Sequence, residues 1–374
     1  MALTGFTFDR PLTERFLELG YDLYRGDPRW IPPSRKGLAA QLSPAFPFYG
    51  RPGHEHRRFL ATAGGRPVAR ALASVHPGLR DRDGTPLGAI GFFESDGDRP
   101  AAGEVLAAAA GWLRSRGLRR VWGPLNFDIW HGYRLMTRGF ERPPFLGEPA
   151  NKPCYPELFE SAGFAVRRRW NSLELEGPEA LDRLLAGGGD VPGLPAGYRV
   201  EPFAARPFPD VMARLHSVLV ASFSSFLGFT EISLGEFGEL MAPARPAVDR
   251  ECSLLFYDDE GVLAGFTAVF LEVSEAVRAM AGRDSPAARL RFLLHRRRGA
   301  RRAMLHLGGI TPREAARRSG LAGAAFRLVL ERLRARGCEN LLATLIARGN
   351  PVRRLYREFA ADERREYALY ERNG

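Results

Sequence analysis

The chain has 374 residues, of which 45% are hydrophobic and 26% are charged, as expected for a globular protein of two ordinary domains. No apolar run reaches the length of a membrane span, and residues 1–16 carry acidic side chains where a signal peptide would be basic and then apolar. We therefore expect a cytoplasmic protein. The three cysteines, Cys154, Cys252 and Cys338, are scattered and odd in number, so neither a disulfide framework nor a metal site is expected.

The formal net charge of +11 would ordinarily indicate a nucleic acid, an acidic membrane or an acidic carrier protein as partner. Nearly all the basic residues are arginine, however, with lysine only at Lys36 and Lys152, a bias typical of a GC-rich genome. We therefore expect no specific nucleic-acid partner. Residues 289–302 form a denser arginine cluster interleaved with leucines, whose simplest interpretation is a solvated loop between two strands. The alternative is a surface that meets an anionic membrane, an acyl carrier protein or phosphates.

The elements of the first half are predicted from hydrophobic periodicity and from turn residues. In chain order they are a helix in 12–24, a proline-rich stretch at 27–33, a β-hairpin of 58–63 and 67–73, a strand at 87–93, a helix at 103–116, a strand at 118–123, a helix at 155–162 and a strand at 166–175.

The second half follows a stretch rich in glycine and proline, which we interpret as a linker. Its predicted elements are a strand at 198–202, helices at 212–226 and 234–241, a hairpin of 253–257 and 262–270, a strand at 303–310, a helix from Gly320 to Gly337, a strand at 341–346 and a short helix that begins at Asn350.

The order strand, helix, strand, helix, strand occurs in both halves, in weaker form in the first. We therefore predict an α/β fold with an α+β mixed sheet, built from two similar units in tandem. The predicted boundaries are 1–176 for the first unit, 177–196 for the linker and 197–374 for the second unit.

The turn at residues 317–322 carries the clearest chemical signal. Gly320 lets the backbone approach a ligand closely, and the amides that follow belong to a helix N-terminus, where they have no partner within the helix. Together with the helix dipole they suit a pyrophosphate, and Arg317 and Arg318 add charge-assisted donors. The alternative is an arginine-rich loop before an ordinary helix.

This turn, the helix and strand after it, and Asn350 and Tyr356 six residues apart resemble the core of the GNAT superfamily of acyl-CoA N-acyltransferases. The resemblance implies that Asn350 lies near the pantetheine arm of coenzyme A and that Tyr356 protonates the departing thiolate. It implies a pyrophosphate loop formed by Arg317, Arg318, Ser319, Gly320, Leu321 and Ala322. A backbone N–H near Gly309 or Ile310 would be the oxyanion donor. The alternatives are that Asn350 only caps a helix and that Tyr356 is a core aromatic.

The first half looks like a second GNAT-like unit without the phosphate loop. Residues 94–98 stand between its strand and helix, and their carboxylates would repel a pyrophosphate. We therefore expect coenzyme A to bind only the second unit, with the first unit forming one wall of an acceptor pocket.

Residues 23–33, 65–70, 139–144 and 155–164 look like those of a group of bacterial tandem-GNAT acyltransferases. That resemblance implies the architecture but not the substrate. Some relatives are linked to N-acylation of long-chain, sphingoid-type amines, which is one possible reaction here. The chain departs from the group's tyrosine-rich segment at residues 151–155.

Acyl transfer to an amine needs a base, for which the sequence offers few candidates. His306 lies on the predicted strand, although a histidine in an apolar strand is more often a core residue. A polar and aromatic loop at residues 126–133 suits an acceptor site, against the alternative of a structural loop. Its candidate substrate-binding residues are Asn126, Asp128, Trp130, His131 and Tyr133.

Three functions are compatible with these patterns. The first is an N-acyltransferase that takes an acyl group from coenzyme A, or from a carrier-protein thioester, to a small-molecule or lipid amine. The second is an aminoacyl-tRNA-dependent ligase like the tandem-GNAT enzymes of the peptidoglycan bridge, of Fem type. The third is a non-catalytic module that binds acyl-CoA or a lipid. The coenzyme A loop favours the first.

Overall fold

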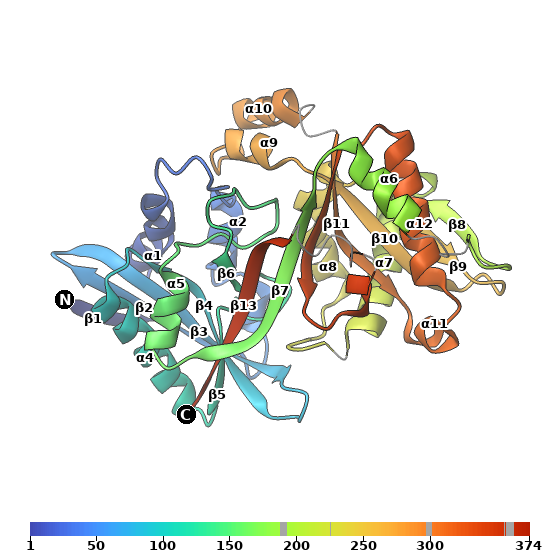
Figure 1. Ribbon diagram of the computed structural model, residues 1–374. Coiled ribbons are helices and arrows are strands. Elements are labelled where there is room, and N and C mark those ends of the chain that lie inside the picture. The colour runs from blue at the N-terminus through green and yellow to red at the C-terminus, as the bar shows by residue number, and fades with distance from the viewer. Residues whose placement is uncertain (188–192, 225, 297–300, 355, 357–362) are drawn as a thin grey trace.

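The computed structural model describes residues 1–187, 193–224, 226–296, 301–354, 356 and 363–374. Within them the chain forms one mixed sheet with helices on both of its faces, which confirms the predicted α/β class (Figure 1). The elements of the first half are β1 (Ala2–Phe6), α1 (Arg10–Leu23), α2 (Arg35–Gln41), α3 (Pro47–Gly50), β2 (Glu55–Ala63), β3 (Arg66–Arg80), β4 (Pro86–Ser95), α4 (Arg99–Arg114), β5 (Arg120–Gly123), β6 (Leu135–Arg138), α5 (Tyr155–Ser161) and β7 (Ala165–Leu175).

The second half is built in the same style. Its elements are α6 (Pro178–Gly187), β8 (Arg199–Pro202), the 3₁₀ helix Phe203–Ala205, α7 (Phe208–Phe223), α8 (Leu234–Met241), the 3₁₀ helix Ala242–Ala247, β9 (Leu254–Tyr257), β10 (Leu263–Leu271), α9 (Ser274–Ala279), α10 (Pro286–Arg296), β11 (Arg302–Ile310), α11 (Pro312–Arg317), α12 (Leu321–Ala335), β12 (Asn340–Ala347) and β13 (Glu363–Asn373).

The strand order is symmetric about a central pair. It runs β1-β2-β3-β4-β5, then β13 and β7, then β12-β11-β10-β9-β8, with β6 attached to β13. Among the strand pairs of the described residues, only β4 with β5 and β11 with β12 are parallel. The C-terminal strand β13 therefore lies between two strands of the first half, as Figure 1 shows in red beside green β7. Because the sheet runs through both halves, the domain boundaries stay a prediction.

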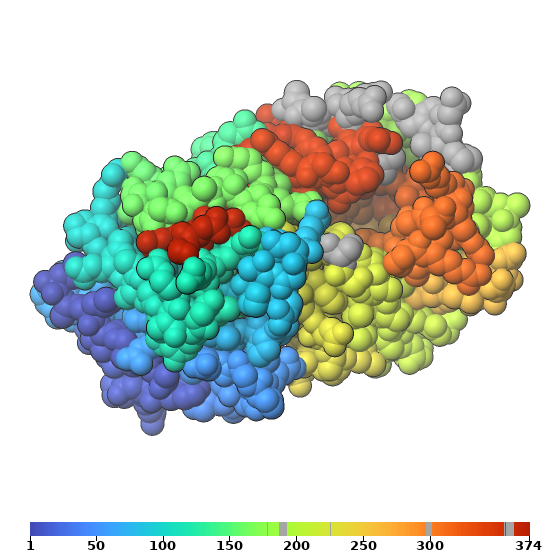
Figure 2. Space-filling view, turned by 90° about the horizontal axis from the view of Figure 1, so that it is seen from below, coloured from blue at the N-terminus to red at the C-terminus, as the bar shows by residue number. Residues whose placement is uncertain are grey.

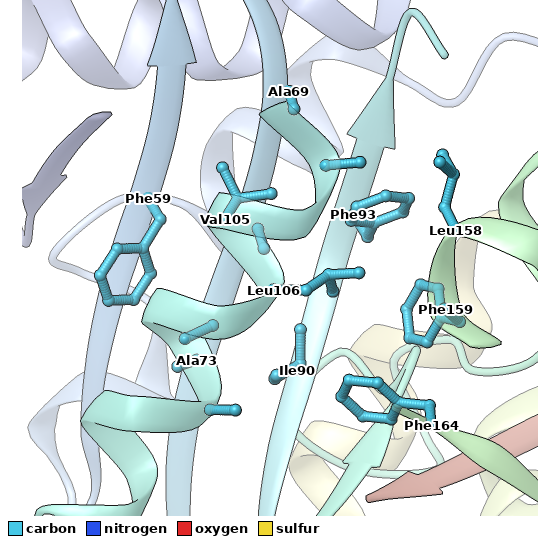
Figure 3. Packing of buried hydrophobic residues seen from close by; sticks show 14 of the residues in the cluster. Phe59, Ala69, Ala73, Ile90, Phe93, Val105, Leu106, Leu158, Phe159 and Phe164 are labelled. Carbon is cyan, nitrogen blue, oxygen red and sulfur yellow. The ribbon is translucent and has the colours of Figure 1, made fainter. Parts of the chain in front are cut away.

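The helix α4 covers one face of the first half because β3 and α4 present small residues to each other. Ala69 and Ala73 of β3 pack in one core cluster with Val105, Leu106 and Phe93, as Figure 3 shows. The alternate residue Leu72 points to the opposite face, where it packs with α1, as the two-residue period of a strand requires. In the second half, α6 and α12 cover one face and α7 and α8 the other.

Two sequence-based interpretations are wrong. Residues 178–187 form helix α6 in place of the first half of the linker, because Ala180, Leu181 and Leu184 bury against the core under α12. The start of the arginine cluster forms helix α10, so it is not a loop. Strands β1, β6 and β13 and the short helix α11 are not predicted from the sequence. The strands owe their form to pairing with partners distant in sequence, as β13 does with β5 and β7.

Candidate active site

The parallel strands β11 and β12 separate part-way along their length. They pair from Arg302 with Asn340 to Leu305 with Ala343, and no later pair joins them within these two described strands. A shift of register follows Ala343, where Leu345 has φ of 54° and its N–H donates to Ser172 on β7 at 2.9 Å. The strand β12 thus turns toward β7, which opens a gap in the sheet beside the last residues of β11.

His306 and Thr344 lie where the strands separate. Nδ1 of His306 is 2.7 Å from the Thr344 hydroxyl oxygen. The other ring nitrogen, Nε2, is therefore available to contact the amine that accepts the acyl group. His306 is exposed to solvent, so the alternative of a buried core histidine is wrong. Protein nevertheless surrounds the ring, and this burial, aided by the positive charge of Arg134, lowers its pKa to about 4. Figure 2 shows the surface recessed between the yellow, orange and red segments of the second half.

The predicted pyrophosphate loop spans the end of α11 and the start of α12. Arg318 takes the left-handed conformation with φ of 49°, and Gly320, the N-cap of α12, has φ of 83°, which glycine adopts without strain. No side chain caps α12 from Gly320, and in the described chain no acceptor meets the backbone N–H of Ala322 or Gly323. These two donors are therefore available to an anion at a helix N-terminus.

Not every residue of the predicted loop faces a ligand. The side chain of Leu321 lies in the core, and its N–H already donates to the Ser319 hydroxyl at 3.2 Å. Ala322, expected on the apolar face of the helix, is exposed. Ser319 in turn donates to the buried carboxylate of Glu314, which also accepts from Tyr198 at 2.7 Å. Ser319 thus stabilises the loop from inside, and the role of Leu321 in the predicted loop stays a prediction.

The two arginines of the loop differ in their partners. Arg317 lies 3.7 Å from Asp258, with two-fifths of its side chain exposed. Arg318 is exposed, and no ion pair to it is found in the described part of the chain. Ile310 ends β11, and its carbonyl accepts from the Ser222 hydroxyl at 2.7 Å. Both guanidinium groups can reach a phosphate from the surface.

Asn350 caps the helical turn after β12, as expected. Its side-chain oxygen accepts from the N–H of Val352 at 3.0 Å. Tyr356 is buried, and its ring meets Phe326 of α12 edge-on at 5.1 Å. Burial raises the pKa of Tyr356 above its ordinary value, so the hydroxyl remains a proton donor. The geometry fits the alternative of a core aromatic as well, and its catalytic role stays a prediction.

The corresponding gap in the first half is filled. Strands β4 and β5 pair only from Leu87 to Ala89, and then the Asn126 side chain accepts from the N–H of Phe92 at 2.7 Å. A Cβ added at Gly91 would lie 2.5 Å from Asn126, which shows how closely this residue packs. Asn126 therefore fills the first gap and has a structural contact there, and its predicted acceptor role stays a prediction.

The N-terminus of α4 is also occupied by its own side chains. Asp98 accepts from the N–H of Ala101 at 2.9 Å. Glu94 accepts from the Tyr155 hydroxyl at 2.7 Å and lies 3.9 Å from Arg70, so its charge is compensated. The N-terminus of α4 thus has a side-chain cap of its own, and the absence of a pyrophosphate site in the first half stays a prediction.

Most of the predicted acceptor residues hold their own loop together. Asp128 accepts from the N–H of Trp130 at 2.8 Å and lies 2.7 Å from Nδ1 of His131. The Trp130 indole donates to the carbonyl of Thr230 at 2.9 Å, which fixes the loop to the second half. Tyr133 alone of the five lies against Trp170, at 5.7 Å between rings. The acceptor role of the loop stays a prediction.

Sequence reasoning missed Arg134, Arg168, Trp170 and Thr344. Arg134 directly follows the predicted loop, and no pattern distinguishes it from other arginines of this arginine-rich chain. Among the described residues, no group of three or more His, Cys, Asp and Glu side chains is arranged to hold a metal. No described helix is both long and apolar enough to cross a membrane.

No protein-family model matches the chain. Among curated proteins, Protein YghO of Escherichia coli strain K12 is 30% identical over 152 residues, which make up 40% of this chain and 38% of that protein. The chain thus matches well under half the length of this relative.

Solved structures match over the whole length. A tandem GNAT protein from the clavulanic acid biosynthesis pathway covers 100% of this chain and 98% of its own, with TM-score 0.53 and 15% identity. Eis1 from Mycobacterium abscessus covers 100% and 74%, with TM-score 0.50 and 12% identity. A probable N-acyltransferase from Enterococcus faecalis covers 100% and 73%, with TM-score 0.50 and 10% identity. At these identities the likeness is one of fold.

Proposed function

This chain has the tandem GNAT fold, and on that premise we propose that it is an acyl-CoA-dependent N-acyltransferase whose active site lies where β11 and β12 separate. One observation carries the proposal, namely the difference between the two parallel strand pairs. The first gap holds Asn126 and the helix after it is capped by Asp98, whereas among the described residues His306 and Thr344 lie in the second gap and no side chain caps α12 from Gly320. These differences support the second unit as the place for a thioester with a pyrophosphate.

The chain's own groups have distinct tasks in this reaction. The N–H groups of Ala322 and Gly323, with Arg317 and Arg318, would hold the pyrophosphate. Tyr356 would give its proton to the departing thiolate. Because the pKa of His306 lies near 4, its imidazole is neutral at pH 7 and holds a proton only briefly, so it would pass the proton of the ammonium on to water.

The binding half of the proposal is tested at Ala322. We expect Ala322→Glu to weaken acetyl-CoA binding at least ten-fold, about 1.4 kcal/mol, because its carboxylate would meet the pyrophosphate. The fold should tolerate the change, since Ala322 is exposed and an acidic residue in the first turn favours a helix. Calorimetry with acetyl-CoA and palmitoyl-CoA would measure both affinity and preferred chain length.

The control is Ala322→Gln, which has nearly the same size without the charge and should bind nearly as well as the parent. Equal loss in both variants would indicate crowding and not charge. If the parent chain binds neither thioester, the coenzyme A reaction is wrong and the aminoacyl-tRNA or carrier-protein alternatives take its place.

A second candidate acceptor, a long-chain amine held in an anionic membrane, is favoured by helix α10. Leu290, Leu293 and Leu294 are 58%, 56% and 67% exposed, and their spacing places them on one face. The helix also carries Arg289, Arg291 and Arg296 and no acidic residue. Leucines flanked by arginines suit a surface of anionic lipid.

We expect the chain to sediment with phosphatidylglycerol vesicles and not with phosphatidylcholine vesicles. Replacing Leu290, Leu293 and Leu294 by glutamine should abolish this sedimentation, while Leu234→Gln on α8, also exposed, should not. If the variant with all three leucines replaced still sediments with the vesicles, the chain contacts the membrane through a surface other than α10. If the chain binds an acyl carrier protein through α10 and does not bind vesicles, the carrier protein is the partner of this helix.

A further inference from the structure

Two arginines meet around one tryptophan where the two halves join. The Arg134 guanidinium carbon lies 3.7 Å from the ring centre of Tyr133 and 4.5 Å from that of Trp170. The guanidinium carbon of Arg168, two residues before Trp170 on β7, lies 5.9 Å from the Trp170 ring. Both guanidinium groups lie over the faces of aromatic rings, which hold the groups in place but do not neutralise their positive charge.

Neither cation has an acidic partner in the described part of the chain. Arg134 donates to the Tyr133 hydroxyl, and its buried Nε has no hydrogen-bond acceptor. Glu148, the carboxylate whose charge acts on Arg134, is committed to an ion pair with Arg365 at 3.0 Å. Burial and the charge of neighbouring Arg82 lower the pKa of Arg168, whose surroundings are thus cationic. A guanidinium that is taken out of water without a carboxylate partner is costly in free energy unless another anion pairs with it.

The position of Arg134 is rigid. Its backbone has φ of 84°, and its N–H donates to the carbonyl of Pro124 at 3.1 Å. A bridge between Leu125 and Tyr133 closes the loop just before it. Trp170, against which Arg134 lies, pairs with Ala347 of β12 and packs in one cluster with Leu345, so this cation is held next to the place where β12 leaves β11. Such preorganisation is typical of a group that positions a ligand.

We propose that Arg134, supported by Arg168 and framed by Tyr133 and Trp170, binds an anionic group of the acceptor, a carboxylate or phosphate carried by the same molecule as the reacting amine. This inference rests on the proposed N-acyltransferase function, because that function places the reacting amine of the acceptor at His306, while Arg134 holds its anionic group. It names the substrate class: an amine that is also an anion, such as an amino acid or a phosphorylated amine.

Matched pairs of amines test the proposal by binding as well as by turnover. Phenylalanine and phenethylamine differ by the carboxylate alone, and phosphoethanolamine and ethanolamine by the phosphate alone. We expect the parent chain to bind one anionic member at least ten-fold more tightly than its neutral counterpart by calorimetry, and to show the same preference in kcat/KM for release of coenzyme A. Which pair shows the preference distinguishes carboxylate from phosphate.

The variant Arg134→Gln should remove that preference and leave the affinity for acetyl-CoA and for the neutral amines unchanged. The control is Arg167→Gln, on β7 next to Arg168, whose guanidinium is already paired with Asp81 at 3.2 Å and Glu371 at 3.4 Å. It should keep the preference. No preference in the parent for either anion, or a preference that survives Arg134→Gln, would overturn the site.

A second readout does not depend on how well Arg134→Gln folds. Because a nearby cation lowers the pKa of His306, an anion bound at Arg134 should raise that pKa in the parent chain. Titration of the imidazole by NMR, with the His306 signal assigned from His306→Gln, would detect the change. A His306 pKa that phosphate, phenylalanine and phosphoethanolamine all leave unchanged overturns the proposal, whereas loss of acetyl-CoA binding alone would overturn the proposed function and not this site.

Discussion

Replacing Tyr356 with phenylalanine is expected to lower kcat by about 10²–10⁴-fold, the usual contribution of a general acid, while leaving the Kd for acetyl-CoA unchanged. Phenylalanine keeps the edge-on contact with Phe326 and the buried volume, so only the hydroxyl is lost. Burial raises the pKa of this hydroxyl, and its ionisation should therefore cause no loss of activity as the pH rises to about 9.

The matched control is Tyr257→Phe. Tyr257 is buried in the same half, and its hydroxyl has no hydrogen-bond partner in the described chain, so kcat should not change. Steady-state release of free thiol, with the Kd from calorimetry, would separate the two effects. An unchanged kcat in Tyr356→Phe would make this residue a core aromatic only.

The second large effect is expected at Arg365, in the strand that joins the two halves. Its side chain is 1% exposed and forms ion pairs with Glu148 at 3.0 Å and Glu174 at 3.7 Å, over the ring of Phe145 at 3.9 Å. Arg365→Leu should reduce the free energy of unfolding by about 3–5 kcal/mol, because Glu148 is left as a buried charge without a partner. The midpoint of urea unfolding would measure it.

The surroundings show why Glu148 is the sensitive partner. Glu174 keeps Arg302 at 3.0 Å and lines a cavity of about 210 Å³. Glu148 does not line that cavity and has no exposed side-chain surface. The double variant Arg365→Leu/Glu148→Leu removes both charges and should recover much of the stability. A double variant as unstable as the single one would mean that packing around Phe145, and not charge, is what was lost.

Arg10→Ala is the control for the loss of an arginine as such. Arg10 and Glu14 form an ion pair with 90% and 66% of their side chains exposed. Water screens such a pair, and its loss should change the unfolding midpoint little. A loss comparable with that of Arg365→Leu would contradict the assignment of the effect to burial.

Local sequence signals predicted the elements around the candidate site well. The helix α12, the buried strand β12 and the cap at Asn350 depend on residues within a few positions of each other, so periodicity and capping rules suffice for them. The loop at residues 317–322 was also found from its own glycine and arginines.

Interactions distant in sequence decided what those signals could not. The loop pattern predicts that Asn126 binds the acceptor, but its side-chain oxygen accepts from the N–H of Phe92, 34 residues earlier. This contact holds Asn126 in the gap between β4 and β5. His306 is predicted as a candidate base with a core histidine as the alternative, and the sequence leaves both open because a strand pattern cannot show where a neighbouring strand turns away. Helix α6 was hidden by its glycine-rich surroundings until α12 buried its leucines.

By itself the sequence determined the class of fold, the tandem repeat of elements, and the open N-terminus of α12, because each follows from neighbouring residues. Only the tertiary structure decided that β13 crosses into the first half, that the first gap is filled, and that Arg134 lies against Trp170. The physical reason is that strand pairing and buried charge depend on partners tens to hundreds of residues away, which local patterns do not encode.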